Sequence, residues 1–479
     1  MKRLVVAGSA VTGLRRGKGR LRRQLPREGR QGVFRILGSP DKKGSSMQGI
    51  RKVSRRTIGK MAVGAAAGGI ATGAMSRVYA APTFLALQSN PVEITFAHIW
   101  GTQPGSQPAE TKHPSVQMID AFNAHDLGVK VISRTDSGNY QETLTKVQAE
   151  LAAGNPPALC TTPWSNIEMA IEGLGVNNLN EMVGDDQVTE MTKYLKPEVL
   201  PLVQEDGGTY GTPLAFSSPV MYYNADALKA AGLTEEGMFA DWPSFTAGLQ
   251  ALHEATGEAT FATFVNHDWP AQALIQSNGG HIYNEDGSLA IDSPEAIEAL
   301  HVFADLAEPG LYLKSLISEV RPAFLSGAMP VATGSVASLG SVSRQVQFEL
   351  GTAPYPVFPG KERRMPSGGS FIGCYAREEE QQQAAWEFLK FVVSEEAQTI
   401  WGQTGYLNAS TWELEALPGQ DAAIVQLEEG LTRETSWPGQ RGSEIQTTWG
   451  TYCERMWLGD ISVEDGVKEA KSEMEAMAG

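Results

Sequence analysis

The stretch Val92-Glu93-Ile94-Thr95-Phe96-Ala97 is typical of a short apolar strand. A helical stretch from Ser115 to Asn123 follows it, and a second strand, Val129-Lys130-Val131-Ile132, comes after the helix. Strand, helix and strand at this spacing make a βαβ unit. The same alternation continues along the chain, so the sequence predicts an α/β fold of layered sheets and helices.

Turn and cap residues indicate where later elements begin and end. The segment 206–211 is typical of a hairpin turn between Val203 and Pro213. Asn224 follows an apolar strand and is placed to cap a helix that ends at Gly232. The segment Asp292-Ser293-Pro294 is placed to cap a long amphipathic helix, and a further helix starts with 384–391. We find no internal repeat and no long linker in the sequence.

The N-terminal part has the layout of an export signal. The basic segment Ser54-Arg55-Arg56-Thr57-Ile58-Gly59-Lys60 precedes an apolar run, 61–75, that is too short and too Gly-rich for a membrane-spanning helix. Small residues up to Ala80 match a signal-peptidase site, so we expect cleavage after Ala80. The arginine pair and the weakly apolar run resemble a twin-arginine signal, and the plain Sec route stays open.

Residues 1–46 form a basic, Gly-rich extension without hydrophobic periodicity. Met47 is well placed to be the initiator, in which case the extension is an over-long gene start and 47–80 is the signal peptide. The alternative is a real extended basic region that begins at Met1. In both cases we expect the segment to be removed, so its arginines do not indicate nucleic-acid binding.

Removal of this leader makes the remaining chain strongly acidic. The chain has 39 Lys and Arg and 55 Asp and Glu, of which 19 and 2 lie in residues 1–80, which leaves 20 basic against 53 acidic side chains. The expected mature protein therefore carries a formal charge near −33. Such a field repels a phosphate backbone, so we expect no nucleic-acid partner.

Length and cysteine content restrict the fold further. About 400 residues exceed one hydrophobic core and suit two domains. The chain has an odd number of cysteines, Cys160, Cys374 and Cys453, and they form no CxxC spacing. The sequence therefore indicates no disulfide framework and no metal or iron–sulfur site. No cysteine directly follows the signal. We therefore expect a soluble, unanchored periplasmic protein.

Seven motifs occur in one order from Val92 onward, and together they resemble the family 1 extracellular solute-binding proteins of ABC importers. This family includes the maltose-binding and glycerol-3-phosphate-binding proteins. The motifs are Gly138-Asn139-Tyr140, 153–158, 210–213 with 217–224, 242–245, 324–329, 367–369 and 403–407. The resemblance implies the periplasmic-binding-protein fold of type II, with two α/β lobes, a ligand cleft between them and a hinge of several crossings. Carried over, lobe 1 comprises 92–213 and 325–380, and lobe 2 comprises 217–323 and 381–479.

The resemblance also implies ligand-binding positions. A sugar needs flat aromatic surfaces and a few fixed polar groups. Trp164, directly after a strand, and Trp269, in a loop of the second lobe, match family positions, although a lone Trp commonly packs in a core. Trp100 is equally compatible with ligand contact and with packing in a core. The polar positions that match are Tyr140, Ser217, Gly369 and Tyr406, with Ser335 and Arg441 matching more loosely.

Two of these positions leave an alternative open. Arg441 is equally compatible with a solvated surface loop. Trp164 stands where the glycerol-phosphate-binding branch has an acidic residue, which favours a saccharide or glycoside over glycerol phosphate. The resemblance therefore implies capture of a carbohydrate and delivery to membrane permease subunits by a monomer, with glycerol 3-phosphate, a glycerophosphodiester or a polyol as the alternative.

Other classes of function find little support in the sequence. A secreted carbohydrate-active enzyme is the remote alternative, because acidic residues are plentiful, yet no GxSxG, HExxH or P-loop motif occurs. The chain has seven His and the mature part has no HxH or HxxxH spacing. We expect neither catalysis nor a cofactor or metal.

Overall fold

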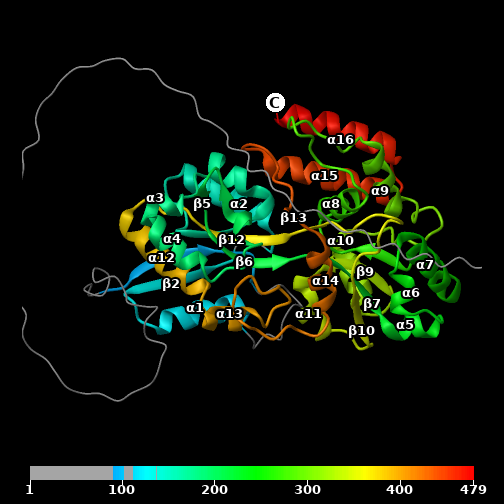
Figure 1. The fold of residues 1–479 in the computed structure, drawn as a ribbon, viewed down its shortest axis with the longest axis horizontal. Coiled ribbons are helices and arrows are strands. Elements are labelled where there is room, and N and C mark those ends of the chain that lie inside the picture. Colours follow the sequence, from blue (N-terminus) through cyan, green and yellow to red (C-terminus); the bar gives the residue numbers. More distant parts are fainter. Residues whose placement is uncertain (1–89, 102–111, 136–137, 479) are drawn as a thin grey trace, which may run out of the picture. The chain divides into compact units, whose positions relative to one another are not determined.

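Two β-sheets organise the chain (Figure 1). The structure is a computed structural model that describes residues 90–101, 112–135 and 138–478, so the extension 1–46 and the signal 47–80 lie outside the described residues. The first sheet has the order β2-β1-β3-β12-β6, and the second has the order β10-β7-β9-β8. Their strands are β1 (Val92–Ala97), β2 (Val129–Arg134), β3 (Leu159–Pro163), β6 (Thr212–Ser217), β7 (Pro219–Asn224), β8 (Phe261–Thr263), β9 (Val331–Ser335), β10 (Leu350–Ala353) and β12 (Gly368–Cys374). The α/β prediction is confirmed.

The first sheet is mixed in direction. β1 pairs in parallel with β2 and with β3, as the βαβ prediction requires, while β12 runs antiparallel to both β3 and β6. In the second sheet, β7 runs antiparallel to β9 and β10, and β8 is parallel to β9. Two small pairs complete the strands: β4 (Gln204–Glu205) with β5 (Gly208–Thr209), and β11 (Met365–Pro366) with β13 (Leu431–Thr432).

Helices cover both sheets. On the first sheet, α12 packs against β1, β6 and β12, and α13 packs against α1. In the second part, α15 packs against α8, α9 and α16 (Figure 1). The longer helices are α1 (Pro114–Ala124), α2 (Tyr140–Ala152), α4 (Asp185–Thr192), α7 (Trp242–Thr256), α8 (Asp268–Ser277), α9 (Pro294–Ala304), α10 (Ile317–Leu325), α12 (Glu379–Val392), α14 (Asp421–Gly430), α15 (Gly442–Trp457) and α16 (Val463–Ala478). The shorter ones are α3 (Leu179–Val183), α5 (Ala225–Ala230), α6 (Glu235–Met238), α11 (Leu339–Ser343) and α13 (Glu395–Trp401), and η2 (Trp164–Asn166) follows β3.

The chain crosses between the two sheets at several places. β6 ends at Ser217 in the first sheet, and β7 begins at Pro219 in the second, so Ser218 alone separates them. The side chain of Gln426 on α14 donates to the Ser218 hydroxyl at 2.5 Å and fixes this crossing. The chain returns between β10 and β12, and it leaves the first sheet again between α13 and α14. These connections form the predicted hinge of several crossings.

The sheets divide the chain differently from the lobe boundaries we expected. We expected 325–380 in lobe 1, but β9 and β10 pair with β7 in the second sheet, and only β12 joins the first. We expected 381–479 in lobe 2, but α12 and α13 pack on the first part. A strand or helix joins whichever surface buries its apolar side, and this partner is not encoded in its position along the chain.

The local signals in the sequence agree with the structure. Asp206 and Gly207 both adopt positive φ, 48° and 79°, in the hairpin between β4 and β5. Asn224 accepts from the backbone N–H of α5, and Ser293 does the same for α9, as capping residues should. Among the helices of the described residues, none has the length and apolar character needed to cross a membrane.

Candidate functional site

The first residues of β12 bring most of the predicted site residues together. Gly368 pairs with Ser217 at the end of β6, and Gly369 pairs with Phe216. Gly369 has φ of 114°, and a Cβ atom there would lie 1.9 Å from the carbonyl oxygen of Ala215. Only glycine fits this position without displacing the backbone. The backbone of β12 can therefore approach β6 closely beside the crossing to the second sheet.

A row of hydroxyl and indole groups extends from this point. Tyr140, the first residue of α2, donates from its hydroxyl to Oγ of Ser370 at 3.0 Å and also hydrogen-bonds with Tyr406. The indole N–H of Trp100 donates to the hydroxyl of Tyr406 at 3.3 Å. Burial raises the pKa of both tyrosines above the usual value. Both phenols therefore keep their protons and act as hydrogen-bond donors or acceptors.

The rings of the two predicted ligand tryptophans pack against the same strand, β12. The ring of Trp269, at the start of α8, packs directly on Gly368, because a Cβ at Gly368 would lie 2.1 Å from it. Trp164, the first residue of η2, stacks on Phe371 with ring centres 5.9 Å apart. Trp164 is fully buried and Trp269 is 9% exposed. Among the described residues, neither indole N–H has a hydrogen-bond partner.

Two of the looser matches lie apart from this cluster. Ser335 ends β9 opposite Pro219, and its hydroxyl accepts from the backbone N–H of Ala337. Arg441 is exposed, and its guanidinium donates to the carboxylate of Glu444 on the same helix at 2.5 Å and 2.9 Å. The structure therefore places Arg441 in a surface ion pair, in agreement with the surface alternative, and does not bring it to the cluster.

Polar residues that the sequence analysis missed join the site from the second part of the chain. The side chain of Gln446 on α15 donates to the carboxylate of Asp268 at 2.9 Å and to the hydroxyl of Ser165 at 3.3 Å. Gln141 on α2 donates to Gln446 at 3.0 Å. Glu434, which follows β13, is buried, and its backbone N–H donates to the hydroxyl of Ser367 at 3.2 Å. These contacts join the first and second parts of the fold, so the site lies between them.

Burial changes the acidity of the two carboxylic acids. Burial raises the pKa of Asp268 from 3.8 to about 7, while its bonds from Gln446 and from backbone N–H groups act in the opposite direction. Burial and the neighbouring Asp268 raise the pKa of Glu434 well above its usual value. Burial therefore shifts both groups toward the neutral form relative to a carboxyl group in water, because water is excluded from them. Asp268 directly precedes Trp269 in the sequence, but no local motif marks Glu434.

Two cavities open at the ends of this row. One, of about 170 Å³, lies between the two parts and is lined by Trp100, His113 and Tyr406 on one side and by Arg321 and Arg344 on the other. Burial, followed by the charge of Arg344, lowers the pKa of His113 to about 4. The other cavity, of about 730 Å³, is reached by Glu434 and lined by residues of both parts, among them 168, 205, 276, 279–283 and 432–436. Tyr406 and Trp100 of the row thus line the first cavity and Glu434 lines the second, whereas Trp164, Trp269 and Asp268 line neither.

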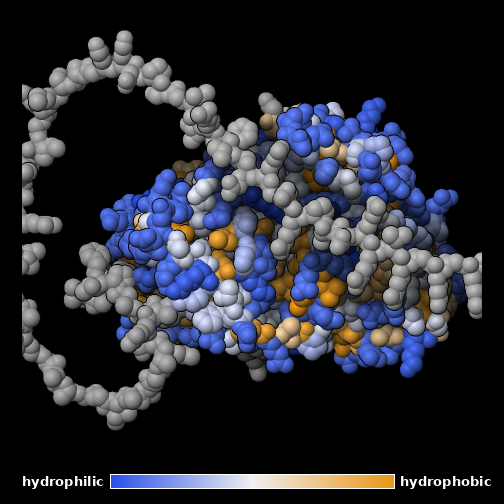
Figure 2. All heavy atoms as spheres, in the orientation of Figure 1, coloured by the Kyte–Doolittle hydropathy of each residue, from blue (hydrophilic) through white to orange (hydrophobic). Residues whose placement is uncertain are grey.

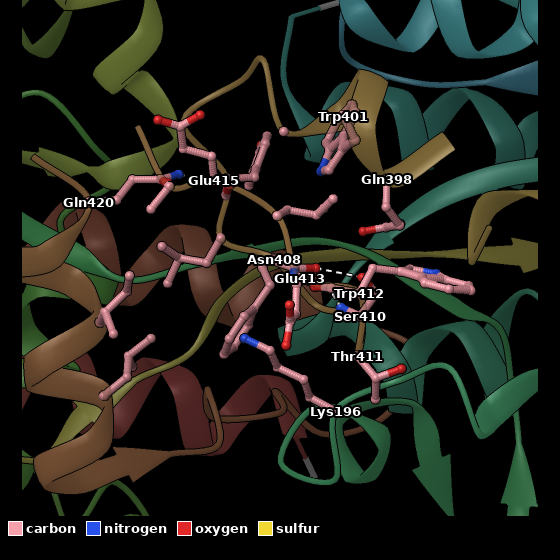
Figure 3. A pocket seen from close by; sticks show the side chains of 18 of the residues that line it. Lys196, Gln398, Trp401, Asn408, Ser410, Thr411, Trp412, Glu413, Glu415 and Gln420 are labelled. Atoms are coloured by element: carbon pink, nitrogen blue, oxygen red, sulfur yellow. Dashed lines mark hydrogen bonds between the residues drawn. The ribbon is translucent and has the colours of Figure 1, made fainter. Parts of the chain in front are cut away.

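A third cavity, of about 630 Å³, lies beside the crossings, near α14 and the loop 407–416 (Figure 3). Its polar side chains are mostly bonded to their own surroundings: Ser410 donates to Asn408, Asn408 to the carbonyl of Trp412, and Gln420 to two backbone carbonyls. On the face in Figure 2, hydrophobic side chains gather in this central region, while hydrophilic ones cover α3, α4 and α12. In the described part of the chain, the charged side chains of this cavity have no hydrogen-bond or ion-pair partner, so they are available to a polar ligand: Lys196, Glu198, Glu413, Glu415 and Glu428.

Known proteins resemble this chain in sequence and in fold. A protein of Brucella melitensis, sn-glycerol-3-phosphate-binding periplasmic protein UgpB, is 27% identical over 335 residues, which cover 65% of this chain and 77% of the relative. The structure of UgpB from Mycobacterium tuberculosis in complex with glycerophosphocholine superimposes with a TM-score of 0.68 at 21% identity, over 81% of this chain and 98% of that one. Lmo0181 of Listeria monocytogenes in complex with cycloalternan gives 0.69 at 19% identity, over 81% and 99%.

These solved structures confirm the two-lobed solute-binding fold. The family model described as "Bacterial extracellular solute-binding protein" matches residues 117–421, which is more than half of the chain and includes every strand of the two sheets except β1. The resemblance stated from the motifs is confirmed: the chain belongs to the bacterial extracellular solute-binding proteins.

Proposed function

We propose that this protein is the extracytoplasmic binding component of an ABC importer and captures a carbohydrate, as a sugar, an oligosaccharide or a glycoside. The observation that carries the proposal is the set of contacts on β12: the rings of Trp164 and Trp269 pack on Phe371 and Gly368, and the hydroxyl of Tyr140 donates to Ser370 between these two positions in sequence. Flat rings match the apolar faces of a sugar, and hydroxyl groups match its rim. A bound carbohydrate would lie between the two lobes and hold them together, and permease subunits would recognise the closed form.

We propose lobe boundaries that follow the two sheets. We assign β1, β2, β3, β6 and β12 with α1, α12 and α13 to lobe 1, and the strands of the second sheet with α8, α9, α15 and α16 to lobe 2. Ligand contacts are proposed for Tyr140, Trp164, Ser217, Trp269, Gly369 and Tyr406, and for Ser335 at the crossing. Arg441 is left out of this set because it is paired with Glu444.

Glycerol 3-phosphate or a glycerophosphodiester is the second candidate. The observation in its favour is the kinship with the Brucella melitensis protein, which is named for glycerol 3-phosphate. The aromatic rings and hydroxyls that contact β12 carry no positive charge themselves, which favours carbohydrate. In favour of a phosphate are the arginines of the two cavities, Arg321 and Arg344 beside Tyr406 and Arg364 and Arg433 beside Glu434. The family is one of binding proteins, and we propose no catalytic activity.

A thermal-shift screen tests the function directly. The panel contains mono- and oligosaccharides, polyols, glycerol 3-phosphate and glycerophosphocholine. Because a ligand that binds only the folded state stabilises it, saccharides should raise the melting temperature and the phosphates should not. The carbohydrate assignment fails if only the phosphates do so, and no shift by any compound would refute both candidates.

Export is proposed from the leader. The segment 47–80 would act as a twin-arginine signal cleaved after Ala80, releasing an unanchored monomer into the periplasm. N-terminal sequencing of the exported protein tests this assignment: a first residue other than Ala81 would refute the cleavage site. Replacing Arg55 and Arg56 by lysine should stop export if the twin-arginine route is used, whereas a Sec signal would tolerate the change.

A further inference from the structure

A cavity lined by two arginines lies between the two lobes beside Tyr406. Its volume is about 170 Å³. Trp100, His113 and Tyr406 line it from the side of the first sheet, and Arg321 and Arg344 line it from the side of the second. Arg321 lies on α10, which packs against β8 and β9, and Arg344 directly follows α11. A group that fills this cavity therefore contacts both lobes.

Neither arginine has an acidic partner in the part of the chain that the structure describes. Within 90–101, 112–135 and 138–478, no ion pair includes Arg321 or Arg344, and no Asp or Glu lines the cavity. Arg321 donates to the hydroxyl of Ser341 at 2.6 Å, and its guanidinium lies 6.0 Å from the ring centre of Phe264. The guanidinium of Arg344 has no hydrogen-bond partner among the same residues. The positive charge at this cavity is therefore not neutralised by a nearby acid.

The lack of an acidic partner sets these two arginines apart from the other arginines that the structure describes. Arg377 donates to two backbone carbonyls. Each of the rest pairs with a carboxylate: Arg134, Arg363, Arg364, Arg433, Arg441 and Arg455. Outside the leader the chain has 53 acidic and 20 basic side chains, so acids are available for nearly every arginine. Two arginines without an acid at one cavity therefore point to a negative group that comes from outside the chain.

Burial makes the missing partner of Arg321 costly. Arg321 is partly buried, and the loss of water around its guanidinium lowers the pKa of Arg321 below the usual value. A cation away from water is stabilised only by an opposite charge or by hydrogen bonds. Ser341 provides one acceptor for a group that has five N–H donors. A carboxylate or phosphate would provide both the opposite charge and further acceptors, in the paired geometry that a guanidinium favours.

His113 adds a hydrogen-bond donor to the cavity. Its Nδ1 accepts from the backbone N–H of Ser115 at 3.1 Å. Burial, followed by the charge of Arg344, lowers the pKa of His113 to about 4, so the ring is neutral at pH 7. The neutral ring therefore carries its proton on Nε2, which has no partner among the described residues and is available to an anion.

Tyr406 connects the cavity to β12. Its hydroxyl hydrogen-bonds with Tyr140, whose own hydroxyl donates to Ser370 on β12 at 3.0 Å. A sugar that lies along these groups would place one of its substituents at the arginines. We propose that Arg321 and Arg344 form a subsite for a carboxylate or phosphate group carried by the solute, and that the solute is an acidic saccharide. This inference rests on the proposed carbohydrate function and names its ligand class.

Matched sugars test the charge of the ligand. Glucose, glucuronate, glucose 6-phosphate and glucosamine form one set, the corresponding galactose compounds form a second, and maltose with its aldonate and phosphate derivatives forms a third. Affinities for the exported protein are measured by calorimetry. In a set that binds, the carboxylate or the phosphate should bind at least tenfold more tightly than the neutral sugar, because a bond between a guanidinium and an anion is stronger than one between neutral groups. Equal or weaker binding of both acidic members overturns the proposal.

Inorganic anions test whether the group belongs to the solute. Phosphate and sulfate are titrated alone and then together with the neutral sugar. If either ion alone binds as tightly as the acidic sugar does, the cavity holds a free anion and the proposal is overturned. Binding of the acidic sugar at least tenfold more tightly than both ions supports it.

Variants show whether the two arginines cause the preference. Arg321→Gln and Arg344→Gln should each weaken the acidic sugar about tenfold or more and leave the affinity for its neutral counterpart within about twofold, because one charged donor is lost in each. Arg344→Glu should reverse the preference, so that the neutral sugar binds more tightly than the acidic one. Arg441→Gln is the matched control: the same change is made in an arginine that is paired with Glu444 outside the cavity, so its affinities should match wild type.

The outcomes separate this inference from the proposed function. If neutral sugars bind as tightly as acidic ones, or if both glutamine variants retain the wild-type preference, the inference fails and the carbohydrate function stands. If no sugar in any set binds, both fail. The unliganded melting temperature of each variant is measured first. Arg344 is exposed, so should Arg321→Gln not fold, Arg344→Gln and Arg344→Glu decide.

Discussion

Removal of the ionisable group at Asp268 should stabilise the unliganded protein at alkaline pH. Asp268 is 1% exposed, and burial raises its pKa from 3.8 to about 7. Asn keeps an acceptor oxygen for the 2.9 Å bond from Gln446 but carries no charge at any pH. The substitution therefore removes the ionisation of one buried acid and retains its main contact.

The sign and size of the effect follow from proton linkage. The folded state holds the proton of Asp268 more tightly than the unfolded state does, so stability is lost as pH rises from about 4 to about 7 and stays lost above. A rise of the pKa from 3.8 to about 7 corresponds to about 4 kcal/mol at ~1.36 kcal/mol per unit. We expect Asp268→Asn to be about 2 to 4 kcal/mol more stable than wild type at pH 8, about 1 to 2 kcal/mol more stable at pH 5, and nearly equal to it only at pH 4 and below.

Urea unfolding of the ligand-free protein from pH 4.5 to pH 8 measures this difference. Other acids titrate in the same range, so the informative quantity is wild type minus variant at each pH. Glu387→Gln controls for the loss of a buried acid elsewhere, since Glu387 is paired with Lys390. A difference for Asp268→Asn that does not grow between pH 5 and pH 8 would contradict the reasoning from burial.

Three further substitutions test the site. Gly369→Ala should cost about 3 kcal/mol or more in chemical unfolding, because φ is 114° and a Cβ would overlap the β6 carbonyl. Trp269→Ala should abolish the ligand-induced thermal shift and leave the unliganded melting temperature nearly unchanged if the 9% exposed ring serves the ligand; a large loss of unliganded stability would mark it as a core residue, as its packing on Gly368 allows. Arg441→Ala should change neither ligand affinity nor stability by more than about 1 kcal/mol, because its ion pair with Glu444 is exposed; a strong loss of binding would return Arg441 to the site.

Local sequence signals predicted the elements well. The strand at Val92, the hairpin at Asp206 and the helix cap at Asn224 each depend on a few neighbouring residues, and the structure has all three. The grouping of elements into lobes was harder to predict. β9 and β10 pair with β7 because of surfaces formed elsewhere in the chain, and α12 covers the first sheet for the same reason.

The site was predictable in part. Family positions indicated Tyr140, Trp269 and Gly369, which the structure gathers at β12. The sequence could not indicate Glu434, because the neighbours that affect its ionisation, Ser165 and Asp268, are distant in sequence. The signal available for Asp268 was its place next to Trp269 in a loop-like segment.

The unsatisfied groups of the site bear on how the two lobes respond to ligand. The lobes touch through Gln141 and Gln446, and Trp437 donates its backbone N–H to the carbonyl of Ser165. Near this contact, the indole N–H groups of Trp164 and Trp269 and the side-chain NH2 of Gln272 are buried without partners among the described residues, and a buried donor of this kind costs about 1 to 3 kcal/mol. A ligand that supplies the missing partners removes this cost only when the lobes are together, whereas separation of the lobes lets water do so. We therefore expect the ligand to shift the equilibrium between separated and joined lobes toward the joined form, by the free energy gained when these donors find partners. Binding of the solute would in this way produce the shape that a permease recognises.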